Sequence, residues 1–249
     1  MKVFWASKTN WSNGDYGDVA LSVDGGWENM GMWGSILSDK FYYSIQSTWT
    51  YVVWGAWNSS TEESRIFYSV SLDSAHTWSD AVTVTDEDWS YFRPGLAIAY
   101  STPEPATSVD HVWTTWADAD GNTKVASVDI YTDSVEVQTV MTANDDRDFY
   151  QAPSITAFYD EILVMSGVVW DTSYGFGTDM DIAATFSVDD GNTWGADYDW
   201  YYWPDTDDYP DSWDYSAAPS YSLEGVMGFS MVKGYSGQPD DVLFLSNNT

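Results

Sequence analysis

Residues 187–194 read Ser187-Val188-Asp189-Asp190-Gly191-Asn192-Thr193-Trp194, and this octapeptide decides the fold. A Ser and an Asp two residues apart can both hydrogen-bond the backbone of a turn, while the Gly supplies a positive φ angle. The Trp can cover the resulting hairpin from water. We therefore interpret the octapeptide as a structural turn to which no chemistry is assigned.

Weaker copies of this pattern, S-x-D-x-G-x-T-W, recur along the chain. The nearest copy is Ser71-Leu72-Asp73-Ser74-Ala75-His76-Thr77-Trp78, in which Ala75 stands in place of the Gly. Ser22-Val23-Asp24-Gly25-Gly26 keeps the first half of the pattern, and Ser127-Val128-Asp129 keeps only its opening. The residues with a structural role in the motif are therefore Ser187, Asp189, Gly191, Thr193, Trp194, Ser71, Asp73, Thr77, Trp78, Ser22, Asp24 and Gly26.

This pattern resembles the Asp box, the bacterial neuraminidase repeat of the sialidase-like β-propellers. In that superfamily the box forms the hairpin between the third and fourth strands of a blade and lies away from the ligand. The resemblance implies an all-β propeller made of antiparallel four-stranded blades. We call Ser71–Trp78 box 1 and Ser187–Trp194 box 2.

The spacing of the copies predicts five blades. Their opening serines follow one another in steps of 49, 56, 60 and 59 residues, at Ser22, Ser71, Ser127, Ser187 and, by extrapolation, Ser246. An aromatic residue that ends an apolar run repeats with a similar period, at Trp5, Trp54, Trp113, Trp170 and Phe229. Periods of about 50 residues are typical of propeller blades.

We expect one domain over residues 1–249, with blades at about 1–38, 39–87, 88–143, 144–203 and 204–249. A Pro near the start of the innermost strand marks three of these blades, at Pro94, Pro153 and Pro219. We expect the first unit to lack an innermost strand, and the last stops within its expected box. Two alternatives follow: five blades that close into a ring, which we favour, or part of a six-bladed ring.

The net charge excludes several classes of partner. Eight Lys and Arg residues against 39 Asp and Glu residues give a formal net charge of −31, so nucleic acid and anionic membranes would repel the chain. An acidic excess with few Lys is the profile of a surface kept soluble in high salt. A halophilic extracellular protein is therefore one expectation, and an ordinary acidic secreted protein is the other.

Other classes of site and location are limited by what the sequence lacks. It has no cysteine, which excludes disulfides, thiolate metal sites and Cys nucleophiles. No run of about 18 apolar residues is present for a membrane span, so we expect no membrane insertion. The first residues do not resemble a signal peptide, and a targeting segment of a secreted form would have been removed.

A ligand is expected at the axial mouth of the predicted propeller. Loops between strands two and three, and between successive blades, surround this mouth, and here they combine carboxylates with aromatics. Aromatic faces stack on sugar C–H surfaces while Asp, Asn and Arg fix hydroxyl groups, so the composition suits a glycan or glycoprotein partner. The candidate ligand-binding residues are Arg65, Arg93, Arg147, Trp57, Trp89, Tyr91, Trp116, Tyr150 and Trp213.

Most of the basic residues map to this same predicted face. They are Lys8, Lys40, Arg65, Arg93, Lys124, Arg147 and Lys233. One interpretation is a positive centre inside a negative shell, which would attract an anionic ligand. The alternative is that each base pairs locally with a neighbouring carboxylate.

Phe92-Arg93-Pro94 resembles the Phe-Arg-Ile-Pro signature of sialidases, although it is one residue shorter. Sialidases grip the substrate carboxylate with three arginines, and this chain has three. No Tyr and Glu nucleophile pair can be identified by spacing, which leaves Tyr150 as the candidate nucleophile.

We therefore favour a non-catalytic, extracellular glycan-binding or surface-interaction propeller. The alternatives are a sialidase-type exo-glycosidase and a structural subunit of a viral or cell-surface assembly, which would contact copies of itself or other subunits.

Calcium is the other chemical possibility, and no further cofactor is implied. Asp118-Ala119-Asp120-Gly121-Asn122 places several hard oxygens close together, with Asp118 and Asp120 as the candidate ligands. The alternative for this segment is a simple turn. The two histidines, His76 and His111, fall in different blades and are expected to be structural.

We expect the folded chain to become more stable as salt is added, because its net charge is −31. Salt shortens the range of the repulsion between surface carboxylates, from ~10 Å at 0.1 M to ~3 Å at 1 M. Thermal unfolding measured from low salt to about 1 M NaCl should show a rising midpoint. A midpoint that stays constant or falls would contradict this expectation.

Overall fold

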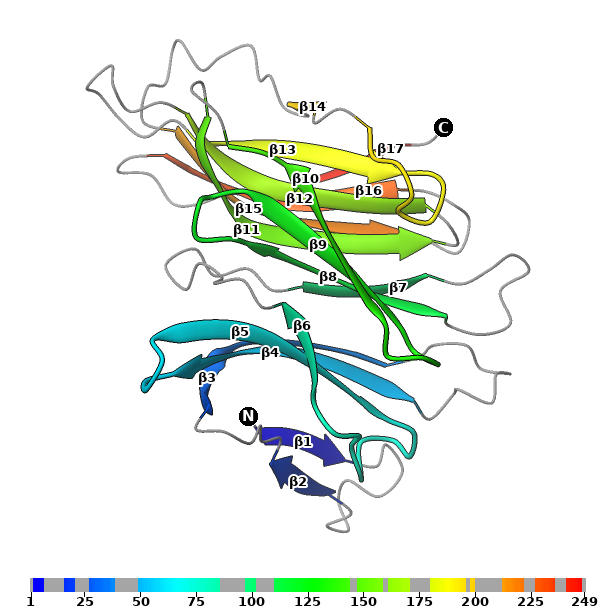
Figure 1. Ribbon diagram of the computed structural model, residues 1–249. Helices are drawn as coiled ribbons and strands as arrows, with labels where there is room; N and C mark the ends of the chain where they lie inside the picture. Colours follow the sequence, from blue (N-terminus) through cyan, green and yellow to red (C-terminus); the bar gives the residue numbers. More distant parts are fainter. Residues whose placement is uncertain are drawn as a thin grey trace.

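The computed structural model consists of β-strands joined by turns (Figure 1). It describes residues 2–6, 16–20, 27–38, 49–85, 97–101, 110–143, 147–158, 161–170, 180–195, 198–199, 212–221, 227–235 and 241–247. Within these ranges no helix is long and apolar enough to cross a membrane.

The strands form antiparallel sheets in chain order. A hairpin opens the series, with the strands β1 (Lys2–Ala6) and β2 (Tyr16–Ala20). The next sheet has the order β3 (Trp27–Ser38), β4 (Thr50–Asn58), β5 (Glu63–Ser71) and β6 (Val82–Thr85). It is followed by a sheet of β7 (Ala97–Ser101), β8 (His111–Ala117), β9 (Thr123–Asp129) and β10 (Val135–Met141).

The last two groups of strands share one hydrogen-bonded sheet. The first group is β11 (Arg147–Phe158), β12 (Glu161–Trp170), β13 (Met180–Ser187) and β14 (Tyr198–Asp199). The second group is β15 (Ser212–Tyr221), β16 (Met227–Tyr235) and β17 (Asp241–Asn247). A single parallel bridge, between Met180 and Trp213, joins them.

The first strands of successive sheets meet one another, which makes the fold a β-propeller. Strand β3 contacts β7, β7 contacts β11, and β11 contacts β15. Each sheet therefore begins beside its neighbours and extends outward from them, as the blades of a propeller do. The predicted all-β propeller of antiparallel blades is confirmed. Figure 1 shows β1 and β2 on the opposite side of the molecule from the group of strands β11 to β17, so closure into a ring stays a prediction.

One expected blade boundary differs from the structure. Residues 27–38 were assigned to the first blade, but they form β3 and pair with β4, as in Ser38 opposite Thr50. The repeat period gives the length of a blade but not the residue at which it begins, and the segment has no Pro marker. The other three expected boundaries fall between β6 and β7, between β10 and β11, and between β14 and β15.

The prolines also lie differently from the expectation. Pro153 lies inside β11, where the register shifts between Gln151 and Ser154, and such an irregularity tolerates the missing N–H donor. Pro219 lies inside β15 opposite Phe229, in a part of the strand that pairs only with β16 among the described residues. Pro94 lies outside the described residues.

The core lies between the sheets, because strands near the middle of the row are buried on both faces. Tyr51 and Val53 of β4 pack with Val112 and Trp116 of β8, which joins two successive sheets. Trp113, the neighbour of Val112 in β8, points to the other face and packs in the next cluster. That cluster contains Trp113, Val125, Met141, Ile155, Ile162, Val164 and Ala183, from the sheets β7 to β10 and β11 to β14.

Boxes 1 and 2 fold into the hydrogen-bonded turn that the sequence predicts. In box 2 the Ser187 hydroxyl donates to Asp189 Oδ1 at 2.8 Å and accepts from the Gly191 N–H at 2.8 Å. Asp189 also accepts from the N–H and hydroxyl of Thr193, at 2.8 and 2.6 Å. Box 1 has the same bonds among Ser71, Asp73, Ala75 and Thr77. The third copy, with Ser22, Asp24 and Gly26, lies outside the described residues.

Glycine is required in box 2 for a reason other than its φ angle. Gly191 has a φ of 78°, but Ala75, at the same place in box 1, has a φ of 69°. The turn therefore accepts an alanine in the left-handed conformation. At position 191, however, a Cβ atom would overlap the ring of Trp113. The glycine lets box 2 approach the preceding sheet.

Box 2 is fixed to that sheet by polar and aromatic contacts. Gln138 of β10 donates to the Gly191 carbonyl at 3.1 Å and accepts from Trp194 Nε1 at 3.0 Å. The rings of Trp194 and Trp113 meet edge to face, with centroids 6.4 Å apart, an arrangement that aromatic pairs prefer. Box 2 thus forms a turn within its own sheet and also joins that sheet to the preceding one.

Replacing Gly191 by Ala should destabilise the fold, because the new Cβ would overlap the Trp113 ring. We expect the free energy of unfolding, measured by chemical denaturation, to fall by ~1–3 kcal/mol, the usual cost of overpacking.

The variant Trp113→Leu supplies the control for Gly191→Ala. Leucine is smaller than tryptophan, so Gly191→Ala should lower the free energy of unfolding less in the Trp113→Leu protein than in the parent. A double-mutant cycle measures this difference. An equal cost in both backgrounds would show that the φ angle, and not Trp113, imposes the glycine.

The aspartates of the boxes should make stability depend on pH. The Thr77 N–H and hydroxyl, together with Ser71, lower the pKa of Asp73 to about 2, and Thr193 and Ser187 lower the pKa of Asp189. Each carboxylate thus holds its proton less firmly in the folded chain than in the unfolded one. The resulting stabilisation is complete above the ordinary Asp pKa of 3.8 and is lost as the pH falls towards 2.

The melting temperature of Asp73→Asn should therefore lie below that of the parent at neutral pH, and the difference should shrink from about pH 4 to about pH 2. Asp120→Asn, which changes the same charge on an exposed turn, should show no such narrowing. A difference between parent and Asp73→Asn that stayed constant with pH would contradict the assignment.

Candidate functional site

The direction of the strands brings the predicted ligand-binding residues to one end of the sheets. Trp57 lies near the end of β4 and Arg65 near the start of β5. Arg147 is the first residue of β11, and Trp213 is the second residue of β15. In an antiparallel sheet, the start of the first strand, the end of the second and the start of the third lie at the same end. The boxes follow β5 and β13 and therefore lie at the opposite end.

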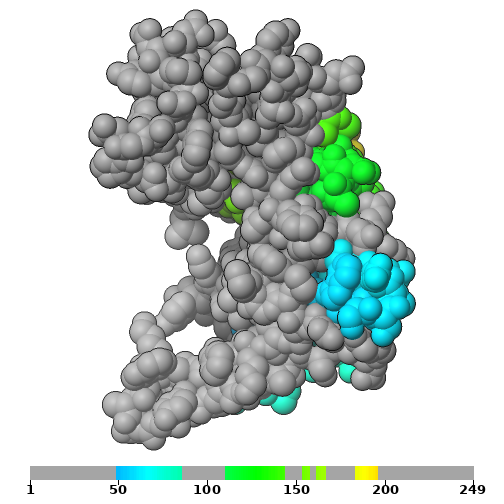
Figure 2. Space-filling model, turned by 90° about the vertical axis from the view of Figure 1, so that its left-hand side faces the viewer, coloured from blue at the N-terminus to red at the C-terminus, as the bar shows by residue number. Residues whose placement is uncertain are grey.

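Figure 2 shows part of this arrangement in the described surface. The cyan surface from the sheet β3 to β6 and the green surface from the sheet β7 to β10 lie one above the other on the same side of the molecule. The two turns between second and third strands, 59–62 and 118–122, come from these sheets.

Trp57 and Arg65 lie close together but face opposite ways. The register pairs Trp57 with Ser64 and Arg65 with Ala56, and residues paired across strands share a face of the sheet. Trp57 is half-buried. Arg65 Nη2 lies 3.3 Å from Glu63 Oε2 and its side chain is 29% exposed. A ligand carboxylate would have to compete with Glu63 for this guanidinium.

Trp116 is not available to a ligand, contrary to the sequence expectation. Its side chain is fully buried and belongs to the cluster between the sheets β3 to β6 and β7 to β10. It shares a strand face with Val112, and that face is covered by the neighbouring sheet. The sequence could not distinguish this core position from an exposed aromatic near the mouth.

The segment proposed for calcium is a tight turn. Asp118 accepts from the N–H of Asn122 at 2.8 Å and from its side-chain amide at 2.9 Å. Lys124 Nζ lies 3.7 Å from Asp118 Oδ2, with both side chains largely buried. Asn122 and Lys124 thus already contact the Asp118 carboxylate, and the Asp120 side chain is exposed on the turn. The arrangement supports the alternative of a turn over a calcium site.

Several candidate residues cannot be placed. Trp89, Tyr91 and Arg93 lie outside the described residues. Strands β11 and β15 contain Arg147, Tyr150 and Trp213, but the side chains of these three also lie outside the described part. Their roles stay predictions, as does the convergence of the three arginines.

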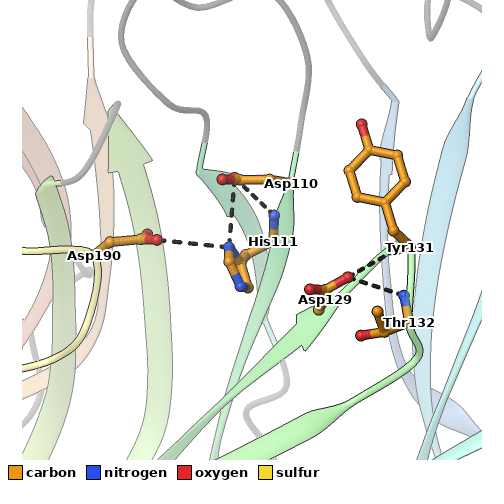
Figure 3. Close-up of polar contacts among 6 residues, drawn as sticks. All are labelled: Asp110, His111, Asp129, Tyr131, Thr132 and Asp190. Atoms are coloured by element: carbon orange, nitrogen blue, oxygen red, sulfur yellow. Dashed lines mark hydrogen bonds and ion pairs between the residues drawn. The ribbon is translucent and has the colours of Figure 1, made fainter.

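The structure brings together a polar group that the sequence did not predict (Figure 3). His111, the first residue of β8, has its Nδ1 3.5 Å from Asp110 Oδ1 and 3.5 Å from Asp190 Oδ2. Asp190 belongs to box 2, so the group spans two sheets at the box end. Asp129 lies opposite His111 in the register of β8 and β9.

The carboxylates change the protonation of His111. The adjacent Asp110 raises the pKa of His111, and Asp190 and Asp129 raise it further, against the effect of partial burial. Asp129 is itself held by the N–H groups of Tyr131 and Thr132 at 2.8 and 2.9 Å, which lower its pKa. No sequence signal links residues 111 and 190, because their contact depends on how two sheets pack.

Comparisons with known proteins support the fold. No protein-family model and no curated protein matches the sequence. A protein of unknown function from Dyadobacter fermentans superposes with a TM-score of 0.56 at 10% identity, covering 91% of this chain and 68% of that one.

Two solved structures of enzymes in complex with arabinobiose are also similar. One is the GH93 α-L-arabinofuranosidase of Fusarium graminearum in complex with arabinobiose, with a TM-score of 0.52 at 9% identity, covering 86% of this chain and 61% of that one. The other is the Penicillium chrysogenum α-L-arabinanase complexed with arabinobiose, with a TM-score of 0.53 at 7% identity, covering 86% and 62%. The chain thus spans less than two thirds of the length of either enzyme, and the likeness extends to the fold alone.

Proposed function

We propose that the protein is a non-catalytic glycan-binding β-propeller that works outside the cell or on a cell or virion surface. One observation carries the proposal: strand direction collects Trp57, Arg65, Arg147 and Trp213 at one end of their sheets, opposite the boxes. Aromatic and guanidinium groups are the side chains that bind sugar faces and sugar carboxylates.

The similar structures suggest a neutral sugar to test. Both similar enzymes were solved with arabinobiose. Propellers of unrelated function share this fold, so the likeness contributes a first probe and not an activity. Arabinobiose is a suitable small ligand because it presents C–H faces to an aromatic ring and carries no charge.

An anionic sugar is the second probe, and it also tests the enzymatic alternative. Phe92-Arg93-Pro94 resembles the sialidase signature, and the chain has three arginines. Of these, Arg65 already pairs with Glu63, so the grip on a sugar carboxylate would depend mainly on Arg93 and Arg147. A planar guanidinium binds a carboxylate through two hydrogen bonds, which an ammonium group cannot reproduce.

Binding should be measured on a glycan array and then by calorimetry with arabinobiose and a sialoside. Trp57→Ala should weaken binding of the neutral sugar by ~0.5–1.5 kcal/mol, the value of an aromatic contact. Arg93→Lys should weaken sialoside binding by ~1–3 kcal/mol and leave the neutral sugar unaffected. The matched control is Leu72→Ala, which removes an apolar side chain that is 54% exposed at the box end and should change neither affinity.

Three results would redirect the proposal. Hydrolysis of a fluorogenic sialoside by the parent, abolished in Arg93→Lys, would establish the sialidase alternative. Loss of affinity in Leu72→Ala, with Trp57→Ala binding like the parent, would place the binding site at the box end. Failure of the parent to bind any glycan, together with self-association in solution, would favour the structural subunit of an assembly.

A further inference from the structure

We propose that Asp110, His111 and Asp190 bind a divalent transition-metal ion, Zn²⁺ in the first instance, at the joint between two sheets. The site lies at the box end, away from the proposed glycan-binding end, and is independent of it. One ligand atom from each residue lies within 4.8 Å of the others. Two of the residues come from the start of β8 and its preceding residue, and the third comes from box 2 (Figure 3).

The distances favour a shared cation over direct hydrogen bonds. His111 Nδ1 lies 3.5 Å from Asp110 Oδ1 and 3.5 Å from Asp190 Oδ2. A direct bond between a charged nitrogen and a carboxylate is shorter, at about 2.7–2.9 Å. Ligand atoms that surround Zn²⁺ tetrahedrally at about 2.0–2.2 Å are separated from one another by about 3.4 Å. The two nitrogen–oxygen distances are close to that edge, and the two carboxylate oxygens lie within 4.8 Å of each other.

A second observation concerns the His111 ring itself. Its Nδ1 is buried from solvent, and the oxygens of Asp110 and Asp190 that face it lie 3.5 Å away, outside good hydrogen-bond geometry. A buried polar atom without a hydrogen bond is uncommon and costly in a folded protein. A cation at the centre of the group would satisfy this nitrogen, and its charge would be balanced by Asp110, Asp190 and the nearby Asp129.

The ligands are held in place by contacts that do not involve a metal. Asp190 lies in box 2 with a φ of 55°, between Asp189 and Gly191, which are both fixed by the turn. The His111 and Trp113 rings lie 6.3 Å apart by their centroids, and Trp113 is the ring against which box 2 packs. Asp110 Oδ1 accepts a hydrogen bond from the backbone N–H of His111 at 2.9 Å. A group held in this way needs little rearrangement to bind an ion.

The donor set indicates which ions would bind. One imidazole nitrogen and two carboxylates suit Zn²⁺, Co²⁺ or Ni²⁺, whereas Ca²⁺ and Mg²⁺ prefer sites made of oxygen alone. Three protein ligands leave a fourth position on Zn²⁺ for water. The bound ion would join the sheet β7 to β10 to the box of the following sheet, and it should stabilise the folded chain.

The test uses the full chain after treatment with a chelator. Calorimetry with ZnCl₂ is performed in a large excess of CaCl₂, which occupies exposed carboxylates. We expect one Zn²⁺ per chain, a rise in melting temperature with Zn²⁺, and a visible absorption band of tetrahedral character with Co²⁺. His111→Asn and Asp190→Asn should each weaken Zn²⁺ binding by about tenfold or more.

The matched control is His76→Asn, because His76 is the second of the two histidines in the chain and lies in box 1, beside the Asp73 carbonyl. This variant should bind Zn²⁺ like the parent. The proposal is overturned if the parent binds no Zn²⁺ in excess Ca²⁺, or if His111→Asn and Asp190→Asn retain its affinity. Equal loss in His76→Asn would also overturn it, and Asp190→Asn decides the matter if His111→Asn does not fold.

Discussion

The packing of Trp194 on Trp113 across Gly191 is the contact on which the described part of the propeller depends. A four-stranded sheet buries both of its faces only when another sheet covers each of them. Trp113 lies in the cluster that joins the sheet β7 to β10 with the sheet β11 to β14. Box 2 covers this cluster through Trp194, which packs against it, and through the bonds of Gln138. A turn within one blade thereby holds two blades together.

This contact lies at one of the two ends of the sheets, and the two ends differ in how they are built. At the box end, local turns, an aromatic pair and the His111 group all lie between sheets and join them. At the other end, the turns 59–62 and 118–122 face away from the boxes. Substitutions at the second end are therefore less constrained by the packing between sheets, which is why a ligand is expected there.

The sequence predicted best what is local. The hydrogen bonds of boxes 1 and 2 lie within eight residues, so the motif alone specifies them. The contact between Gly191 and Trp113 joins residues that are far apart in the chain and was not predicted. Box 1 carries Ala75 at the same place with a similar φ angle, so the turn itself does not require a glycine, whereas the packing of box 2 against Trp113 does. The repeat period gave the length of a blade, but the expected start of the second blade at residue 39 misplaced the sheet that begins with β3.

The candidate site was harder to predict, because composition does not show where a side chain points. Trp116 is a core residue although it lies one residue before the end of its strand. The two basic residues whose side chains are described, Arg65 and Lys124, pair with Glu63 and Asp118. The interpretation of local pairing thus applies to both. With only eight Lys and Arg residues for 39 acidic ones, these two bases act as counter-charges to their neighbouring carboxylates, of which Asp118 is buried. A positive centre at the predicted mouth would consequently depend on bases other than Arg65 and Lys124, and among the described residues the His111 imidazole is the cationic group beside Asp110 and Asp190.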